Sequence, residues 1–187
     1  MYSDKFSLCF QPDSLLIEQV KMMKDRLGEA IGWYPSKNSL AHLTIAEFQA
    51  SESDIQRMHQ QILRCSASFT PVETYLLAFG TYPNGTFFLE VDVQAKPILQ
   101  SYAKKLFQTL QLKQAYKCTD PHLSIGRKLD EEKIQQAYAL FEQPNLHFTC
   151  NQLVLRRLNT IRRQFDILAT YPFLSQPLIE DMQLTLF

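Results

Sequence analysis

The sequence lacks an excess of either charge. Its 187 residues include 19 Lys and Arg against 19 Asp and Glu, so the formal net charge is zero. Bulk charge therefore provides no long-range attraction to nucleic acid or anionic membrane, and any phosphate must be recognised by a local cluster. With 45% hydrophobic residues the chain is able to bury a core, and its length fits one compact unit or two small lobes.

Paired cysteines and long apolar runs are also missing. The four cysteines are scattered without a C-x-x-C pair, and no apolar run approaches the length that spans a bilayer. The N-terminus, MYSDKFSLCF, has no basic segment followed by a long apolar one, as a leader peptide would have. We therefore expect a cytoplasmic protein with reduced thiols and no membrane partner.

The first half of the chain alternates strand-like and helix-like patterns. Strand-like runs cover 5–11, the surroundings of His42, and 69–82, while helical spacing is found over 16–31 and 55–65. The Asn84-Gly85 pair then predicts a hairpin whose tight turn has positive φ at both residues.

The second half repeats this order. A strand over 86–93, a helix over 99–110, a strand around His122 and a helix over 134–141 precede two closing strands, 148–158 and 162–173. Leu8 precedes His42 by nearly the same interval as Leu89 precedes His122. We therefore expect an internal repeat of approximately 5–82 and 86–173 within a single bilobal domain, 1–187, with a C-terminal tail, 174–187. The predicted fold is α+β: two pseudo-symmetric lobes, each a mostly antiparallel sheet with outer helices, around a central cleft.

Two short motifs, AHLTIAEF (41–48) and PHLSIGRKL (121–129), place an imidazole and a hydroxyl two residues apart. Because side chains alternate along a strand, His42 shares a face with Thr44, and His122 shares one with Ser124. If two such faces meet across a cleft, their imidazoles and hydroxyls are suited to bind and cleave a phosphodiester. One imidazole accepts a proton, the other donates one, and the hydroxyls bind phosphate oxygens.

A single histidine in an apolar strand is more often a core residue than a catalyst, but two in register favour chemistry. His59, expected on a helix surface, and His147, expected at the end of a loop, lack a hydroxyl at the matching offset and receive no role. Cys118 and His122 are too few ligands for zinc, so no metal and no cofactor are predicted.

The HLTI and HLSI pair resembles the signature of the two-histidine (2H) phosphoesterases, which include the bacterial 2′-5′ RNA ligase-like proteins. The segments YPSKNSLAHLTIAEF, DPHLSIGR and LVLRRLNTIRRQFDILATYPF are similar to that family's lead into the first motif, its second motif and its final hairpin. Glu47 and Gln49 depart from the family pattern, as does the absence of a Gly-Pro turn in the last hairpin. These departures bear on which substrate is bound more than on which reaction is catalysed.

The resemblance implies metal-independent hydrolysis of 2′,3′-cyclic phosphates at an RNA end or on a nucleotide, with 2′-5′ ligation as a weak side reaction. We assign His122 as the base and His42 as the acid, although the symmetry of the motifs leaves the reverse open. Two alternatives stay open: a non-catalytic module that binds RNA ends or nucleotides in the same cleft, and a metal-dependent hydrolase.

Substrate contacts are predicted near the motifs. Arg127, shortly after Ser124, is expected to hold a phosphate at the cleft mouth, unless it is only a solvated strand end. Among the flanking aromatic residues, Trp33, Tyr34, Tyr82 and Tyr116, we favour Tyr34 or Tyr116 for stacking on a base.

Two further segments invite a role. Four arginines near the last turn either follow a polynucleotide backbone or solvate an exposed hairpin: Arg156, Arg157, Arg162 and Arg163. The tail segment QLTLF, Gln183–Phe187, resembles the short peptides that dock into the bacterial sliding clamp. Packing of this tail onto the protein's own surface is the alternative.

Overall fold

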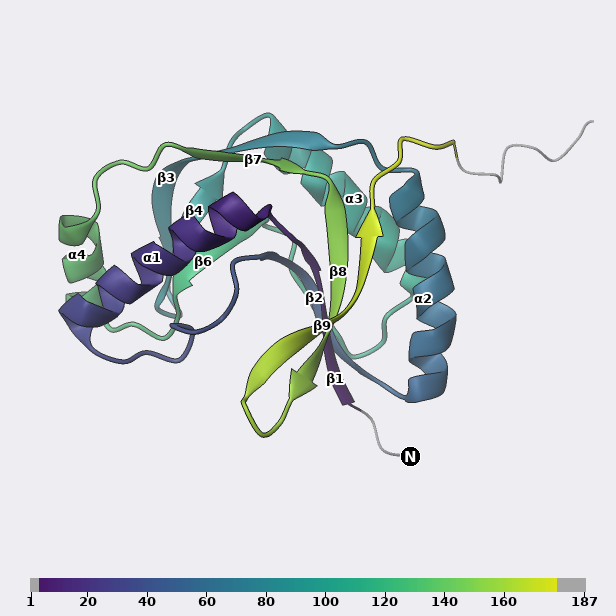
Figure 1. Cartoon of the computed structure of the whole chain (residues 1–187), viewed down its shortest axis with the longest axis horizontal. Helices are drawn as coiled ribbons and strands as arrows, with labels where there is room; N and C mark the ends of the chain where they lie inside the picture. The colour runs from purple at the N-terminus through teal and green to yellow at the C-terminus, as the bar shows by residue number, and fades with distance from the viewer. Residues whose placement is uncertain (1–3, 178–187) are drawn as a thin grey trace, which may run out of the picture.

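The computed structural model describes residues 4–177, which form four helices and one strongly curved, nine-stranded sheet (Figure 1). The strand order is β7-β3-β4-β6-β2-β1-β8-β9, with the short β5 beside β2, and every pair is antiparallel. The elements are β1 Asp4–Phe10, α1 Ser14–Ile31, β2 Leu43–Ala50, α2 Glu52–Ala67, β3 Val72–Tyr82, β4 Thr86–Val91, α3 Ala95–Leu110, β5 Tyr116–Lys117, β6 His122–Gly126, α4 Glu131–Leu140, β7 Leu146–Cys150, β8 Gln152–Asn159 and β9 Gln164–Pro172. None of the helices in this range has the length and apolar character of a membrane span.

The sheet has two halves that meet between β2 and β6. One half contains β7, β3, β4 and β6, and the other contains β2, β1, β8 and β9. Helix α1 packs against α4 and contacts β6 and β7, while α2 packs against α3 and contacts β9. The predicted α+β fold with antiparallel strands and helices on each half is confirmed, but the halves share one continuous sheet.

The apolar run over 148–158 is not a single strand, as the sequence led us to expect. It breaks at Asn151, so that β7 pairs with β3 in one half and β8 pairs with β1 in the other. The Asn151 carbonyl accepts a hydrogen bond from the Phe173 amide (2.8 Å), outside both ladders. As a result, β7 lies beside β3, which pairs with β4 on its other edge, and β8 lies beside β1 (Figure 1).

The predicted β3–β4 hairpin is present, but its turn differs from the expected one. Only Gly85 has a positive φ (77°), and its N–H donates to the Tyr82 carbonyl (3.0 Å). Pro83 and Asn84 are therefore the central residues of the turn. Proline restricts φ to negative values, so the chain turns one residue earlier and uses Gly85 as the left-handed residue that closes the loop.

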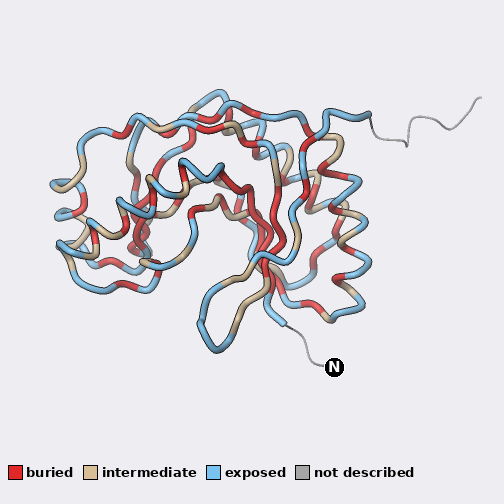
Figure 2. The backbone as a smooth tube through the Cα atoms, in the orientation of Figure 1, coloured by how far each residue is buried: buried red, intermediate tan, exposed pale blue. Residues whose placement is uncertain are grey.

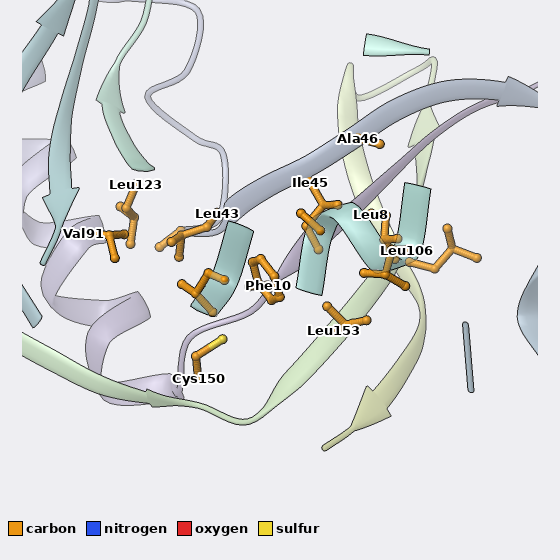
Figure 3. Packing of buried hydrophobic residues seen from close by; sticks show 14 of the residues in the cluster. Leu8, Phe10, Leu43, Ile45, Ala46, Val91, Leu106, Leu123, Cys150 and Leu153 are labelled. Atoms are coloured by element: carbon orange, nitrogen blue, oxygen red, sulfur yellow. The ribbon is translucent and has the colours of Figure 1, made fainter. Parts of the chain in front are cut away.

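Burial is concentrated in the central strands (Figure 2). Leu8, Phe10, Leu43, Ile45 and Leu123 belong to the main apolar cluster (Figure 3). In β1 the opposite face is covered too, since Ser7 and Cys9 are also fully buried. A strand buried on both faces gives no clean alternation of polar and apolar residues.

Candidate active site

The two histidine motifs lie on neighbouring strands at the junction of the sheet halves. Leu43 of β2 pairs with Leu123 of β6, and both side chains are buried in the core. In an antiparallel ladder this register sets Thr44 beside His122 and His42 beside Ser124 on the opposite face. All four of these side chains are partly accessible. The structure thus brings the four predicted residues together on one continuous sheet.

Both imidazoles are held in the same way. Nδ1 of His42 lies 2.6 Å from the carbonyl oxygen of Leu40, and Nδ1 of His122 lies 2.8 Å from that of Asp120. A carbonyl oxygen only accepts hydrogen bonds, so Nδ1 of each ring donates and carries the proton. Nε2 of each neutral ring is then the nitrogen that is free to take up a proton.

The surroundings of His122 include a carboxylate. Asp120 forms an ion pair with Lys96 (Oδ1 to Nζ, 2.5 Å), and it accepts a hydrogen bond from the Tyr82 hydroxyl. That hydroxyl also lies 3.4 Å from Nδ1 of His122. Burial lowers the pKa of His122 below its usual value, while the Asp120 carbonyl and carboxylate partly oppose that effect.

His42 has a different charge environment. Burial, followed by the positive charge of Arg156, holds its pKa well below the ordinary histidine range, and Lys24 and Arg127 act in the same direction. Within residues 4–177, no carboxylate forms a hydrogen bond or ion pair with this ring. His42 therefore favours its neutral form more strongly than His122.

The predicted substrate residues divide into two groups. Arg127 is exposed directly after β6, and its positive charge lowers the pKa of both histidines. Tyr116 is 60% exposed on β5, beside Glu47. Tyr34 is only 2% exposed and donates to the Lys24 carbonyl (2.9 Å). The expectation that Tyr34 stacks on a base is wrong, because its ring packs in the core.

An open hollow of about 470 Å³ adjoins His122. Its walls come from Tyr82, Tyr116, residues 83–84 and the segment 117–120. His42 does not line it. Two tyrosine rings beside a half-buried imidazole provide a place for a planar base next to the histidine pair.

The remaining candidates have structural contacts. His59 is part-buried on α2, where its Nδ1 lies 2.8 Å from the Tyr171 hydroxyl, and His147 lies within β7 rather than at the end of a loop. Within residues 4–177, no group of three or more His, Cys, Asp or Glu side chains lies close enough to hold a metal ion. The clamp-like segment Gln183–Phe187 lies outside the described residues.

The four arginines near the last turn do not act as one cluster. Arg157 pairs with Asp4 and Glu52, and Arg162 pairs with Asp166, all at the surface. Arg156, in contrast, is only 3% exposed and stands on the same side of the sheet as Ser7. The sequence analysis missed this difference, because Leu153, Val154, Leu155 and Arg156 are all buried and β8 has no clean alternation of exposed and buried residues.

Comparison with known proteins agrees with this arrangement. The family model described as the 2′-5′ RNA ligase superfamily matches residues 12–162. No curated protein sequence matches significantly. Among solved structures, E. coli LigT complexed with 3′-AMP superposes with a TM-score of 0.70 at 14% identity, covering 92% of this chain and 99% of LigT.

Two other structures are similar in fold. TT0787 of Thermus thermophilus has a TM-score of 0.63 at 14% identity, covering 92% of this chain and all of TT0787 (100%). Kluyveromyces marxianus Usb1 has a TM-score of 0.58 at 13% identity, covering 91% of this chain and 98% of Usb1. The family match extends over most of the chain and includes both histidine motifs. The chain therefore belongs to the 2′-5′ RNA ligase superfamily, the two-histidine phosphoesterases.

Proposed function

We propose that this protein is a metal-independent phosphoesterase that hydrolyses 2′,3′-cyclic phosphates of RNA or nucleotides. The observation that carries the proposal is the pair of His-x-Thr/Ser motifs on adjacent strands, with both rings oriented through Nδ1 by a backbone carbonyl. The complexes of E. coli LigT with 3′-AMP, ATP and NADP⁺ add support, since they are complexes with nucleotides.

The charges around the rings favour His42 as the base and His122 as the acid, the reverse of the assignment that we preferred from the sequence. A base must be neutral before the reaction, and three cations disfavour the charged form of His42. An acid must be protonated, and the Asp120 carboxylate supports the charged form of His122.

The reaction then proceeds with balanced proton transfers. Nε2 of His42 takes a proton from water, and the water oxygen forms a bond to phosphorus. The bond from phosphorus to one ribose oxygen breaks, and Nε2 of His122 donates its proton to that oxygen. The hydroxyls of Thr44 and Ser124 donate to the non-bridging oxygens as negative charge develops there. If the 5′ hydroxyl of another nucleotide attacks in place of water and the bond from phosphorus to the 3′ oxygen breaks, the same proton transfers give 2′-5′ ligation as a weak side reaction.

Substrate positioning is assigned to residues around the histidines. Arg127 is exposed, and within residues 4–177 no hydrogen bond or ion pair engages it, so its guanidinium is available to a phosphate oxygen. Tyr116 and Tyr82 line the hollow beside His122, where a base can stack.

The test is hydrolysis of 2′,3′-cyclic mononucleotides and RNA ends by wild type, His42→Ala and His122→Ala, with and without a chelator. We expect each substitution to reduce kcat by roughly a hundredfold or more, and the chelator to have no effect. His59→Ala is the matched control, because His59 lies on α2 and contacts Tyr171.

Other outcomes have defined meanings. Activity that survives both active-site substitutions would reject the paired-histidine mechanism. Wild type that binds these ligands through Thr44 and Ser124 without turnover would instead identify a binding module, and activity abolished by the chelator would identify a metal-dependent hydrolase.

A further inference from the structure

Arg156 is a buried cation without a counter-ion. It lies on β8 opposite Ser7 of β1, and its Nη2 donates to the Ser7 hydroxyl (3.0 Å). The guanidinium carbon is 5.3 Å from the centre of the Phe165 ring, while Nε is buried without a hydrogen-bond partner. No ion pair within residues 4–177 includes Arg156.

The adjacent residue shows that this arrangement is unusual. Arg157 points to the other face, remains exposed and contacts two carboxylates. Burial of a charge is strongly unfavourable unless it is paired and hydrogen-bonded, and a guanidinium with an unused N–H is only partly satisfied. Arg156 is therefore arranged to receive an acceptor that the described protein residues do not supply.

A second buried cation lies nearby. Lys24 of α1 is 2% exposed, and its Nζ donates to the carbonyl (2.7 Å) and the hydroxyl (3.0 Å) of Ser39. Burial lowers the pKa of Lys24 to about 8, and the positive charge of Arg156 acts in the same direction. A bound anion would offset the positive charge of both buried residues.

The unpartnered polar atoms of the described residues occur on neighbouring segments. Besides Nε of Arg156, they are Oε1 of Gln11, at the end of β1, and Oγ of Ser36, in the loop that leads to His42. Gln11 also donates through Nε2 to the carbonyl of Ala41, directly before His42 (3.3 Å). Of these three atoms, Nε of Arg156 and Oγ of Ser36 are able to donate a hydrogen bond to an anion, whereas Oε1 of Gln11 only accepts.

The register offsets the backbone of Arg156 from the row of side chains that contains Thr44. Cys9 of β1 pairs with Thr44, whereas Arg156 pairs with Ser7, which lies two residues before Cys9. Two residues of a strand span about 6.6 Å, so Arg156 starts one side-chain row beyond the Thr44 row. The hydroxyls of Thr44 and Ser124 already serve the scissile phosphate in the proposed reaction.

We propose that Arg156 and Lys24 form a subsite for a second phosphate of the substrate, the one attached to the 5′ oxygen of the nucleoside that carries the cyclic phosphate. This inference rests on the proposed function, because it names the substrate class of the same site. The second phosphate is a monoester in a free nucleotide and a diester in an RNA end.

The test compares kcat/KM for three substrates: a nucleoside 2′,3′-cyclic phosphate, the same compound with a 5′-monophosphate, and a dinucleotide that ends in the cyclic phosphate. We expect a ten- to hundredfold preference for the substrates with a 5′ phosphate, which is the size of a charge-assisted hydrogen-bonded contact. The ranking of monoester and diester then identifies the source of the second phosphate.

Substitutions then test whether Arg156 causes the preference for substrates with a 5′ phosphate. Arg156→Gln should bring the ratio of kcat/KM values close to one, while Arg157→Gln should leave the ratio unchanged. The ratio is the appropriate readout because any effect of Arg156 on His42 applies equally to all three substrates. Arg156→Lys, which keeps the charge and loses the planar fork, should give an intermediate ratio.

The two proposals fail in different ways. If wild type hydrolyses all three substrates with equal kcat/KM, the second-phosphate subsite is refuted and the proposed function stands. If wild type hydrolyses none of them, the proposed function itself fails. The wild-type ratio decides the question even if the Arg156 variants do not fold.

Discussion

Asp120 joins three interactions around His122, and the two made by its carboxylate have no equivalent at His42. Its carbonyl orients the ring, while its carboxylate binds Lys96 and the Tyr82 hydroxyl. If Asp120 supports the protonated acid, Asp120→Asn should move the basic limb of the pH–rate profile to lower pH. We expect kcat/KM at pH 7 to fall by roughly three- to tenfold.

The control for this substitution is Asp130→Asn, since Asp130 caps α4 by accepting from the Lys133 amide (2.9 Å) and asparagine can do the same. A basic limb that stays in place in Asp120→Asn, with kcat/KM unchanged, would argue against His122 as the acid.

The two histidines also predict the pH optimum. Activity requires neutral His42 and protonated His122, so it rises as pH increases through the pKa of His42 and falls as pH increases through that of His122. Both pKa values lie below the usual histidine value of about 6.5. Measured kcat/KM should therefore form a bell with its maximum below about pH 6.5. A maximum above neutrality would contradict this assignment of the two groups.

At the residue scale, the sequence predicted the four side chains of the histidine motifs as neighbours because the two-residue period of a strand fixes which of them share a face. It did not predict the burial of Tyr34 or Arg156. The position of Tyr34 depends on the loop after α1, which no periodicity describes. The burial of Arg156 depends on covering one face of β8, and charged residues are rarely covered.

At the scale of elements, the β3–β4 hairpin is fastened to the loop after β6. The Leu129 amide donates to the Gly85 carbonyl (2.9 Å), and a Cβ on Gly85 would lie 2.2 Å from the Leu129 carbonyl oxygen. Gly32 has almost the same φ, 78°, but no atom lies within 4 Å of its Cβ position. Alanine substitutions at the two glycines therefore allow the cost of backbone strain to be compared with the cost of strain plus steric overlap.

Gly32 has φ 78° and ψ −166°, a conformation almost confined to glycine, so we expect Gly32→Ala to lower the free energy of unfolding by about 1–3 kcal/mol from backbone strain alone. Gly85→Ala should cost about 2–5 kcal/mol, because overlap adds to that strain. Urea unfolding followed by circular dichroism measures both values. Equal losses in the two variants would show that the contact with Leu129 is easily relieved.

The order of the elements could be predicted from the sequence, but two of their details could not. Residues 148–158 have strand-forming side chains throughout, so propensity alone does not reveal that the chain changes partners at Asn151. In the turn, Asn84-Gly85 favours a two-residue loop, and Pro83 overrides that preference. Both errors arise where long-range pairing or a neighbouring residue decides the backbone.

At the scale of the whole molecule, the halves of the sheet meet at a narrow junction. Within the described residues, β2 and β6 share one paired position, Leu43 with Leu123, whereas β8 and β9 pair along their full lengths. A ligand held by both histidines would bridge this junction. We therefore expect inorganic phosphate to slow amide hydrogen exchange over 41–45 and 121–126 by several-fold, with little change in β8 and β9.

Exchange is measured by mass spectrometry on wild type and on a double variant, His42→Ala with His122→Ala. The double variant should show no phosphate-dependent protection at the junction. Equal protection in both proteins would mean that phosphate binds without the histidines.

The strand order bears on the predicted repeat, approximately 5–82 and 86–173. We propose that these segments are two copies of one unit whose final strands are exchanged, since β3 lies beside β4 and β8 lies beside β1. The sequence offsets suggested the copies but not the exchange, because spacing along the chain carries no information about which sheet half a strand joins.

This exchange has a consequence for synthesis on the ribosome. The contact between Arg156 and Ser7 joins residues 149 positions apart, so the first strand emerges long before its β8 neighbour. At about 5–20 residues per second, translation leaves that apolar edge without its partner for roughly seven to thirty seconds. Chaperones that shield nascent strands, or a slowly forming transient partner, would have their greatest effect in this interval.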